Sequence, residues 1–164
     1  MLFRSEGKVE EIGAGSGAGF NINVPIPAGS GDGAYRYAFE KVVRPAIERF
    51  KPEFIFVASG FDASYYDQLS RMALHAYTYK WMAQETLKLA DKFSSGRVVA
   101  THEGGYSEVY VPFCGLAVLE AFLDKSSGIP DYMADLSDAA TRKDQLLHPH
   151  QKEMIDLCVK THNL

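Results

Sequence analysis

Apolar positions along the chain fall into short runs separated by longer stretches with helical spacing. Residues 20–24 alternate between apolar and polar side chains, and this alternation predicts a short strand. Residues 54–58 form a continuous apolar run, which is typical of strands buried on both faces of a parallel sheet. Residues 97–101, which include two valines, are predicted to form the next strand.

The stretches between and after these runs have the period of helices. Apolar residues at i and i+4 predict helices over residues 32–50 and 70–93, and shorter helices over 111–122 and 150–160. Asp32 is expected to cap the first of these helices. Pro45 lies inside the same helix and predicts a kink or a break there, because proline lacks the backbone N–H that a helix needs.

The predicted order is strand–helix repeated three times, which indicates an α/β fold with a parallel sheet covered by helices. Residues 1–164 contain no internal repeat and no clear domain boundary. A sheet of three buried-type strands would leave an apolar edge open. We therefore expect the chain to be part of a larger sheet.

Composition and charge narrow the possible partners. The formal net charge is −4, and no stretch of Lys and Arg suggests a nucleic-acid surface. No apolar run is long enough to predict a membrane span, and the N-terminus has no signal-peptide core. Cys114 and Cys158 match no metal or redox spacing, so we interpret them as buried thiols and expect a cytoplasmic location. Nothing in the sequence indicates the oligomeric state.

Candidate chemistry lies in two loops that follow predicted strands, where open parallel sheets bind their ligands. Asp62 follows the strand 54–58, and its carboxylate could hold a divalent metal or could only cap a turn. Tyr106 follows the strand 97–101 and the pair Gly104 and Gly105, which permits close approach of a ligand to the backbone. Its hydroxyl could stabilise an oxyanion, or Tyr106 could be an ordinary core residue.

Several other features favour structural roles. We expect His75 to lie in the core or on the surface of a helix, and His102 to pack beneath the loop after it, with a direct catalytic role as the alternative. His148 and His150 flank a proline and indicate a helix start rather than a metal site. The glycine-rich residues 13–19 lack the preceding strand and following helix of a dinucleotide site.

Four segments in a fixed order carry a family resemblance: residues 19–25 (GFNINVP), 29–32 (GSGD), 59–63 (SGFDA) and 102–107 (HEGGYS). Together they resemble the C-terminal half of class II-type histone deacetylases and, most of all, the bacterial histone deacetylase-like amidohydrolases. The resemblance is strongest over residues 19–123 and weaker from residue 147 onward.

The resemblance implies a three-layer α/β/α fold of the arginase/deacetylase type, with residues 1–164 as the C-terminal part of a single domain. It implies zinc-dependent removal of an acetyl or other acyl group from an acetyl-lysine-type amide or an acetylpolyamine. By the same resemblance Asp62 is a zinc ligand, Tyr106 polarises the substrate carbonyl, and Leu69, Gly104 and Gly105 line the substrate tunnel. The backbone around Phe20 falls where the family can bind a structural potassium ion.

The chain departs from the family pattern in two ways. Gln68 stands where the family usually has proline in an Asp-Pro-Leu tunnel loop, a change expected to loosen the loop. The Asp-x-His pair and the His-His dyad that complete the family's site are absent from all 164 residues, and by the resemblance they would precede Met1. We therefore expect the isolated chain to be inactive. The alternative is a non-catalytic remnant or a partner-binding fragment that lacks a complete metal site.

Overall fold

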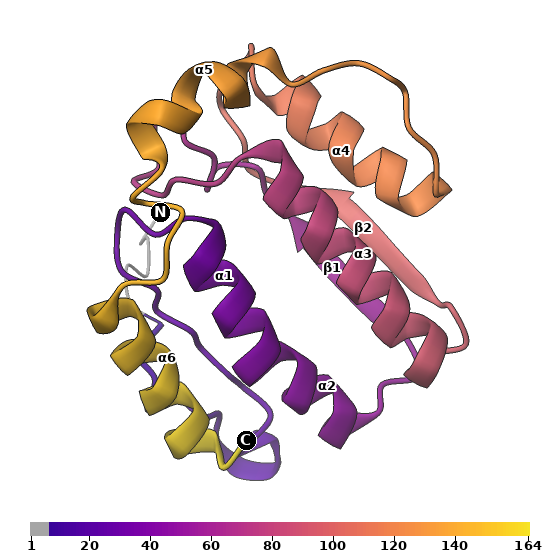
Figure 1. Ribbon diagram of the computed structural model, residues 1–164. Helices are drawn as coiled ribbons and strands as arrows, with labels where there is room; N and C mark the ends of the chain where they lie inside the picture. Colours follow the sequence, from indigo (N-terminus) through magenta and orange to yellow (C-terminus); the bar gives the residue numbers. More distant parts are fainter. Residues whose placement is uncertain (1–6) are drawn as a thin grey trace.

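The computed structural model describes residues 7–164, and for residues 138–141 it describes the backbone alone (Figure 1). The described helices and strands, in chain order, are α1 (Asp32–Ala38), α2 (Arg44–Phe50), β1 (Ile55–Ser59), α3 (Ala76–Phe93), β2 (Val98–His102), α4 (Val111–Leu123), α5 (Tyr132–Thr141) and α6 (Pro149–His162). A 3₁₀ turn, η1 (Gly15–Gly17), precedes α1. Helix α5 was not predicted from the sequence.

The sheet confirms the α/β class and the parallel arrangement. Strands β1 and β2 pair in parallel, with Ile55 opposite Val98 and Ser59 opposite His102, and α3 connects them. Within the described residues the sheet has two strands, so the strand predicted at residues 20–24 is wrong. Ile22 in that segment packs instead against a cluster formed mainly by α1, the turn after it and α6. The alternating pattern was satisfied by this packing, without a neighbouring strand.

One face of the sheet is covered and the other is open. Along β1, Ile55 and Val57 are half-buried, whereas Phe56 between them is 76% exposed. Figure 1 shows the helices gathered on one side of the two strands. Side chains alternate between the two faces of a strand, so the face that carries Phe56 has no covering layer within residues 7–164.

The helix predicted over residues 32–50 is continuous but irregular. A π-helical turn, η2 (Phe39–Val43), joins α1 to α2, and the N–H of Arg44 donates to the carbonyl of Phe39 five residues earlier. Pro45 follows directly. Its ring would collide with the carbonyl four residues back in a regular helix, and the wider turn avoids this. The irregularity predicted from Pro45 is thus confirmed.

Helix α3 begins at Ala76, six residues later than predicted. The N–H of Ala73 donates to the carbonyl of Ser30, and the N–H of Leu74 donates to the carbonyl of Ala63. These backbone groups bond to other loops, so residues 70–75 cannot join the helix. The extended segment instead supports the loop that follows β1.

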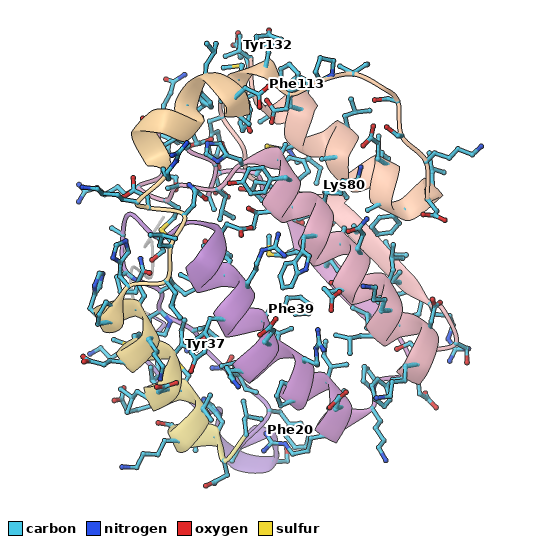
Figure 2. All side chains as sticks on the ribbon, viewed as in Figure 1. Phe20, Tyr37, Phe39, Lys80, Phe113 and Tyr132 are labelled. Carbon is cyan, nitrogen blue, oxygen red and sulfur yellow. The ribbon has the colours of Figure 1, made fainter. Side chains whose placement is uncertain are left out.

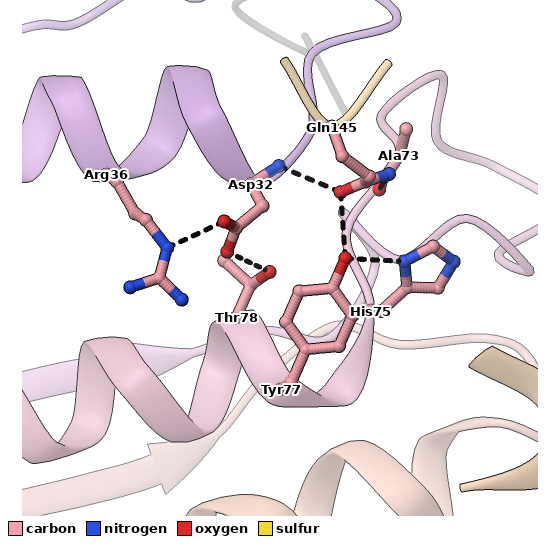
Figure 3. A network of polar contacts seen from close by, with 7 residues as sticks. All are labelled: Asp32, Arg36, Ala73, His75, Tyr77, Thr78 and Gln145. Atoms are coloured by element: carbon pink, nitrogen blue, oxygen red, sulfur yellow. Dashed lines mark hydrogen bonds and ion pairs between the residues drawn. The ribbon is translucent and has the colours of Figure 1, made fainter. Parts of the chain in front are cut away.

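A polar network holds the starts of α1 and α3 together (Figure 3). Asp32 does not cap α1 as predicted, because Gly31 is the N-cap residue. The carboxylate of Asp32 instead accepts from Arg36 at 2.6 Å and from the hydroxyl of Thr78 at 2.8 Å. Gln145 completes the network, since its Oε1 accepts from the N–H of Asp32 at 3.0 Å and its Nε2 donates to the carbonyl of Ala73 at 2.8 Å.

Helices α3 and α4 pack against each other. Between them lies a core cluster that includes Leu74, Tyr79, Tyr110 and Cys114. At its edge Lys80 forms a 2.6 Å ion pair with Glu120 (Figure 2). Both cysteines are buried and free, as expected. In the part of the chain that is described, no helix is both long enough and apolar enough to cross a membrane.

Candidate functional site

The two candidate loops lie side by side at the carboxyl ends of β1 and β2. The N–H of Glu103 donates to the carbonyl of Ser59 at 3.2 Å, and the N–H of Phe61 donates to the carbonyl of Gly104 at 2.8 Å. These bonds extend the pairing of the strands by about one further residue on each side. The loop carrying Asp62 and the loop carrying Tyr106 are therefore anchored to each other directly.

Asp62 lies against the backbone of Gly104. A Cβ atom placed on Gly104 would come within 2.4 Å of Oδ2 of Asp62, and one placed on Gly60 would come within 2.8 Å of Oδ1. Both glycines are therefore needed for the carboxylate to occupy this position. The structure brings Asp62 and Gly104 together at one edge of the sheet.

Gly105 is constrained in a different way. Its φ is +128°, a value that side-chain-bearing residues rarely adopt, and an added Cβ would lie 3.0 Å from Val111 and 3.1 Å from Phe61. The backbone of Gly105 is thus packed between β1's loop and the start of α4. This packing directs the chain outward at Tyr106.

Tyr106 is 52% exposed, so it is not the ordinary core tyrosine that its position alone allowed. Its N–H donates to Oδ2 of Asp67 at 2.7 Å. The other oxygen of Asp67 accepts from the N–H of Leu69 at 2.9 Å. Leu69 is 73% exposed and, together with Asp62, Ala63 and Ser70, lines an open hollow of about 310 Å³.

The described residues at this edge of the sheet include one candidate metal ligand, Asp62, but not a full set of ligands. Within the described residues, no group of three His, Cys, Asp or Glu side chains is close enough to hold a metal ion. Catalytic zinc sites use three protein ligands and leave one position open. Asp62 could supply one such ligand, so the residues that the structure describes do not complete a zinc site by themselves.

Two tyrosines behind Asp62 were not predicted as functional residues. Burial and, secondarily, the negative charge of Asp62 raise the pKa of Tyr35 to about 12. Burial likewise raises the pKa of Tyr79, which packs edge-to-face on Phe61 with ring centroids 5.3 Å apart. Both phenols therefore stay protonated at neutral pH. Only the tertiary structure shows that Tyr35 and Tyr79 lie near Asp62, because both tyrosines are on helices whose sequence pattern indicates core packing.

The histidines have structural positions. His102 is exposed at the end of β2 and stacks on Phe61 with ring centroids 5.1 Å apart, so the expected packing beneath the loop that follows it is not observed. His75 is fully buried just before α3, and its Nε2 lies 2.8 Å from the hydroxyl of Ser137. His148 is the N-cap residue of α6, and its N–H donates to Oε1 of Gln151 at 2.8 Å, which confirms the predicted helix start.

Phe20, whose surrounding backbone falls where the family can bind a potassium ion, lies far along the chain from these loops and is 70% exposed. Its ring packs edge-to-face on Phe50 at 5.9 Å, beside an apolar hollow of about 970 Å³. The glycine-rich segment before it contains the turn η1 and no regular strand or α-helix. The potassium site remains a prediction from the resemblance.

Comparison with known proteins finds histone deacetylases and related amidohydrolases. The histone deacetylase domain model matches residues 2–122. The histone deacetylase-like amidohydrolase of Pseudomonas aeruginosa is 48% identical over 102 residues, which are 62% of this chain and 27% of that protein. A probable deacetylase of Archaeoglobus fulgidus is 36% identical over 121 residues, or 73% of this chain and 34% of that protein.

Solved structures agree. The histone deacetylase Clr3 superposes with a TM-score of 0.77 and 29% identity, over 95% of this chain and 24% of that chain. The HD domain of HDA15 superposes with a TM-score of 0.67 and 26% identity, over 98% of this chain and 43% of that chain. The chain therefore belongs to the histone deacetylase family and has its fold. It spans about a quarter to a third of the length of these two curated relatives.

Proposed function

We propose that this chain carries one zinc ligand, the oxyanion donor and part of the tunnel wall of a zinc-dependent deacetylase. Asp62 is assigned to the metal and Tyr106 to the substrate carbonyl, while Leu69, Gly104 and Gly105 are assigned to the tunnel that holds an acetyl-lysine-type or acetylpolyamine side chain. The observation that carries this proposal is the pairing of the two loops, which puts the Asp62 carboxylate on Gly104, two residues from Tyr106.

The roles follow from the chemistry of each group. A zinc ion, when bound, polarises an amide carbonyl and lowers the pKa of a bound water. The phenol of Tyr106 donates a hydrogen bond to the carbonyl oxygen, and this bond strengthens as negative charge develops there. Gly104 and Gly105 let the backbone of the tunnel wall lie close against Asp62 and Phe61, and the apolar side chain of Leu69 excludes water from the stem of the substrate.

We further propose that the working site is completed by residues outside this chain. Asp62 has no partners of the right kind for a metal ion among the described residues, and one carboxylate does not bind zinc tightly. The open face of the sheet supports the same proposal, because parallel sheets are normally covered on both faces. By itself, the chain would then be a fragment without catalytic activity.

The proposal is tested with a chimera. In the Pseudomonas aeruginosa amidohydrolase, the sequence from the start of the 102-residue match to the C-terminus is replaced by this chain, from the corresponding residue to Leu164. We expect zinc-dependent hydrolysis of a fluorogenic acetyl-lysine substrate by the chimera and none by the isolated chain. In the chimera, Asp62→Ala should release zinc. Tyr106→Phe should lower kcat by about 10²–10³, the usual effect of removing one oxyanion donor.

Tyr132→Phe serves as the matched control, because Tyr132 is also exposed but lies on α5 against Phe113. It should leave kcat unchanged. Metal-dependent turnover by the isolated chain would refute the incomplete site. Full activity of the Tyr106→Phe chimera would show that Tyr106 has a structural role only.

A further inference from the structure

Asp67 is the side chain that links the two loops of the candidate site. Its Oδ2 accepts from the N–H of Tyr106 at 2.7 Å, and its Oδ1 accepts from the N–H of Leu69 at 2.9 Å. Asp67 is only 7% exposed, although Leu69, two residues later, is 73% exposed. A buried carboxylate thus joins the two loops beyond the backbone bonds that pair them near the strand ends.

Burial of a carboxylate is unfavourable unless hydrogen bonds replace its hydration. Within the described part of the chain no ion pair involves Asp67, so backbone N–H groups take the place of a cation. Hydrogen bonds to an ionised carboxylate are shorter and stronger than neutral ones. Asp67 is therefore a strong local link whose two ends are Tyr106 and Leu69.

We propose that Asp67 is the positioning residue of this site: it fixes the backbone of Tyr106 relative to the loop that carries Asp62 and Leu69. Such a residue is needed because the side chain of Tyr106 is exposed. The side chain of Tyr106 is 52% exposed and has little packing to hold it, so its placement depends on the backbone. The bond between Phe61 and Gly104 anchors the loop two residues earlier, and Asp67 anchors Tyr106 itself.

The same link compensates for Gln68. A proline at this position would restrict the loop through its fixed φ. Here Asp67 and Leu69 close an Asx turn around Gln68 through the bond to the N–H of Leu69. The hydrogen bond to the Asp67 carboxylate thus restricts the loop around Gln68, as the ring of a proline at that position would.

Asparagine is the informative replacement. Asn has the shape of Asp, but one of its two terminal groups is an NH₂ donor, which cannot bond to a backbone N–H. Asp67→Asn therefore keeps at most one of the two bonds. In the 164-residue chain, amide hydrogen exchange measured by NMR should become about tenfold faster or more at Tyr106 or Leu69.

Amides in the β1–β2 ladder, such as that of Ile55, should keep their exchange rates and report that the fold is intact. The matched control is Asp124→Asn, since Asp124 is exposed at the end of α4 with a φ of 48° that asparagine also tolerates. It should change neither amide. Unchanged exchange at both Tyr106 and Leu69 in Asp67→Asn would overturn the proposal.

The functional consequence rests on the proposed function and is measured in the chimera. Asp67→Asn should lower kcat at least tenfold with little change in KM, because a displaced Tyr106 weakens a bond that matters in the transition state. Combined with Tyr106→Phe, it should cost much less than the product of the two single effects, since both act through one group. Independent, multiplying effects would overturn the positioning role. A chimera without any activity would refute the proposed function, and the exchange experiment would still decide the role of Asp67.

Discussion

At the scale of single residues, the site depends on the missing side chains of Gly104 and Gly105 as well as on the carboxylate of Asp62. The carboxylate of Asp62 occupies the space that a side chain at Gly104 would fill, and the backbone at Gly105 adopts a conformation suited to glycine. An aspartate after a buried strand is common enough to be a turn cap. Asp62 differs from such a cap because Gly60 and Gly104, which lack a Cβ atom, lie directly beside its two carboxylate oxygens. This close placement makes Asp62 a candidate ligand.

Gly104→Ala tests this arrangement. The new Cβ would lie 2.4 Å from Oδ2 of Asp62, and because a side chain moves more easily than a backbone, the carboxylate should be displaced. We expect zinc affinity of the chimera, measured by chelator competition, to fall by at least tenfold, the scale of losing the orientation of a ligand.

Gly115→Ala is the matched control. A Cβ there would meet its nearest neighbour, Phe61, at 3.8 Å, an ordinary contact, and Gly115 lies inside α4. Alanine should leave zinc affinity unchanged and raise stability by up to about 1 kcal/mol, because it is the better helix former. Equal zinc affinities of the two variants would contradict the placement of Asp62.

At the scale of elements, α3 and α4 are joined by an apolar core with an ion pair at its edge. Lys80 of α3 contacts Glu120 of α4, and Ser127 donates to the same carboxylate through its N–H and its hydroxyl. The bond from Lys80, followed by those from Ser127, holds the pKa of Glu120 at about 2, below its ordinary value of 4.5. The end of α4 is thereby tied to the turn that follows it.

The pH dependence of this link has a definite sign. A carboxyl whose pKa is lower in the folded state contributes stability above its unfolded pKa and loses it as the pH falls through the folded pKa. Urea unfolding should therefore show a loss of stability between pH 4.5 and about 2 that is smaller in Glu120→Gln. Glu153→Gln, an exposed change on α6, should keep the wild-type slope, and identical slopes in all three proteins would refute the link.

At the scale of the whole molecule, the distinctive feature is a parallel sheet with one open face. Phe56 is 76% exposed and stacks on Phe54, with ring centroids 4.5 Å apart, and Val99 of β2 is 43% exposed. Exposed apolar strands with free edges promote association between chains. The isolated chain is therefore expected to self-associate through this face.

Phe56→Lys should reduce that self-association in sedimentation experiments. Stability should change by only about 0.5 kcal/mol, because the side chain is already in contact with water. Leu119→Lys removes a comparably exposed apolar group from α4, away from the sheet, and should leave association as it was. An equal effect of both substitutions would indicate general surface hydrophobicity rather than the open sheet.

Much of the fold was predictable because local patterns determine it. The continuous apolar run at 54–58 and the i, i+4 spacing of Ala38 and Val42 identified a parallel strand and a helix correctly, within a few residues at their ends. Pro45 predicted a disturbance that appears as a π-helical turn. The four segments that include Asp32, Asp62 and Tyr106 indicated the family by their order and spacing together.

Only the tertiary structure decided features that depend on partners distant in sequence. Residues 20–24 have a strand pattern but no strand beside them, and residues 70–75 bond to Ser30 and Ala63 instead of extending α3. Asp67 gave no periodic signal, since its importance lies in a bond to Tyr106 across two loops. The sequence by itself determined the family and most of the elements, although not α5. Which backbone groups meet, and hence how Asp62, Asp67 and Tyr106 are held, was determined by long-range hydrogen bonds that no local pattern encodes.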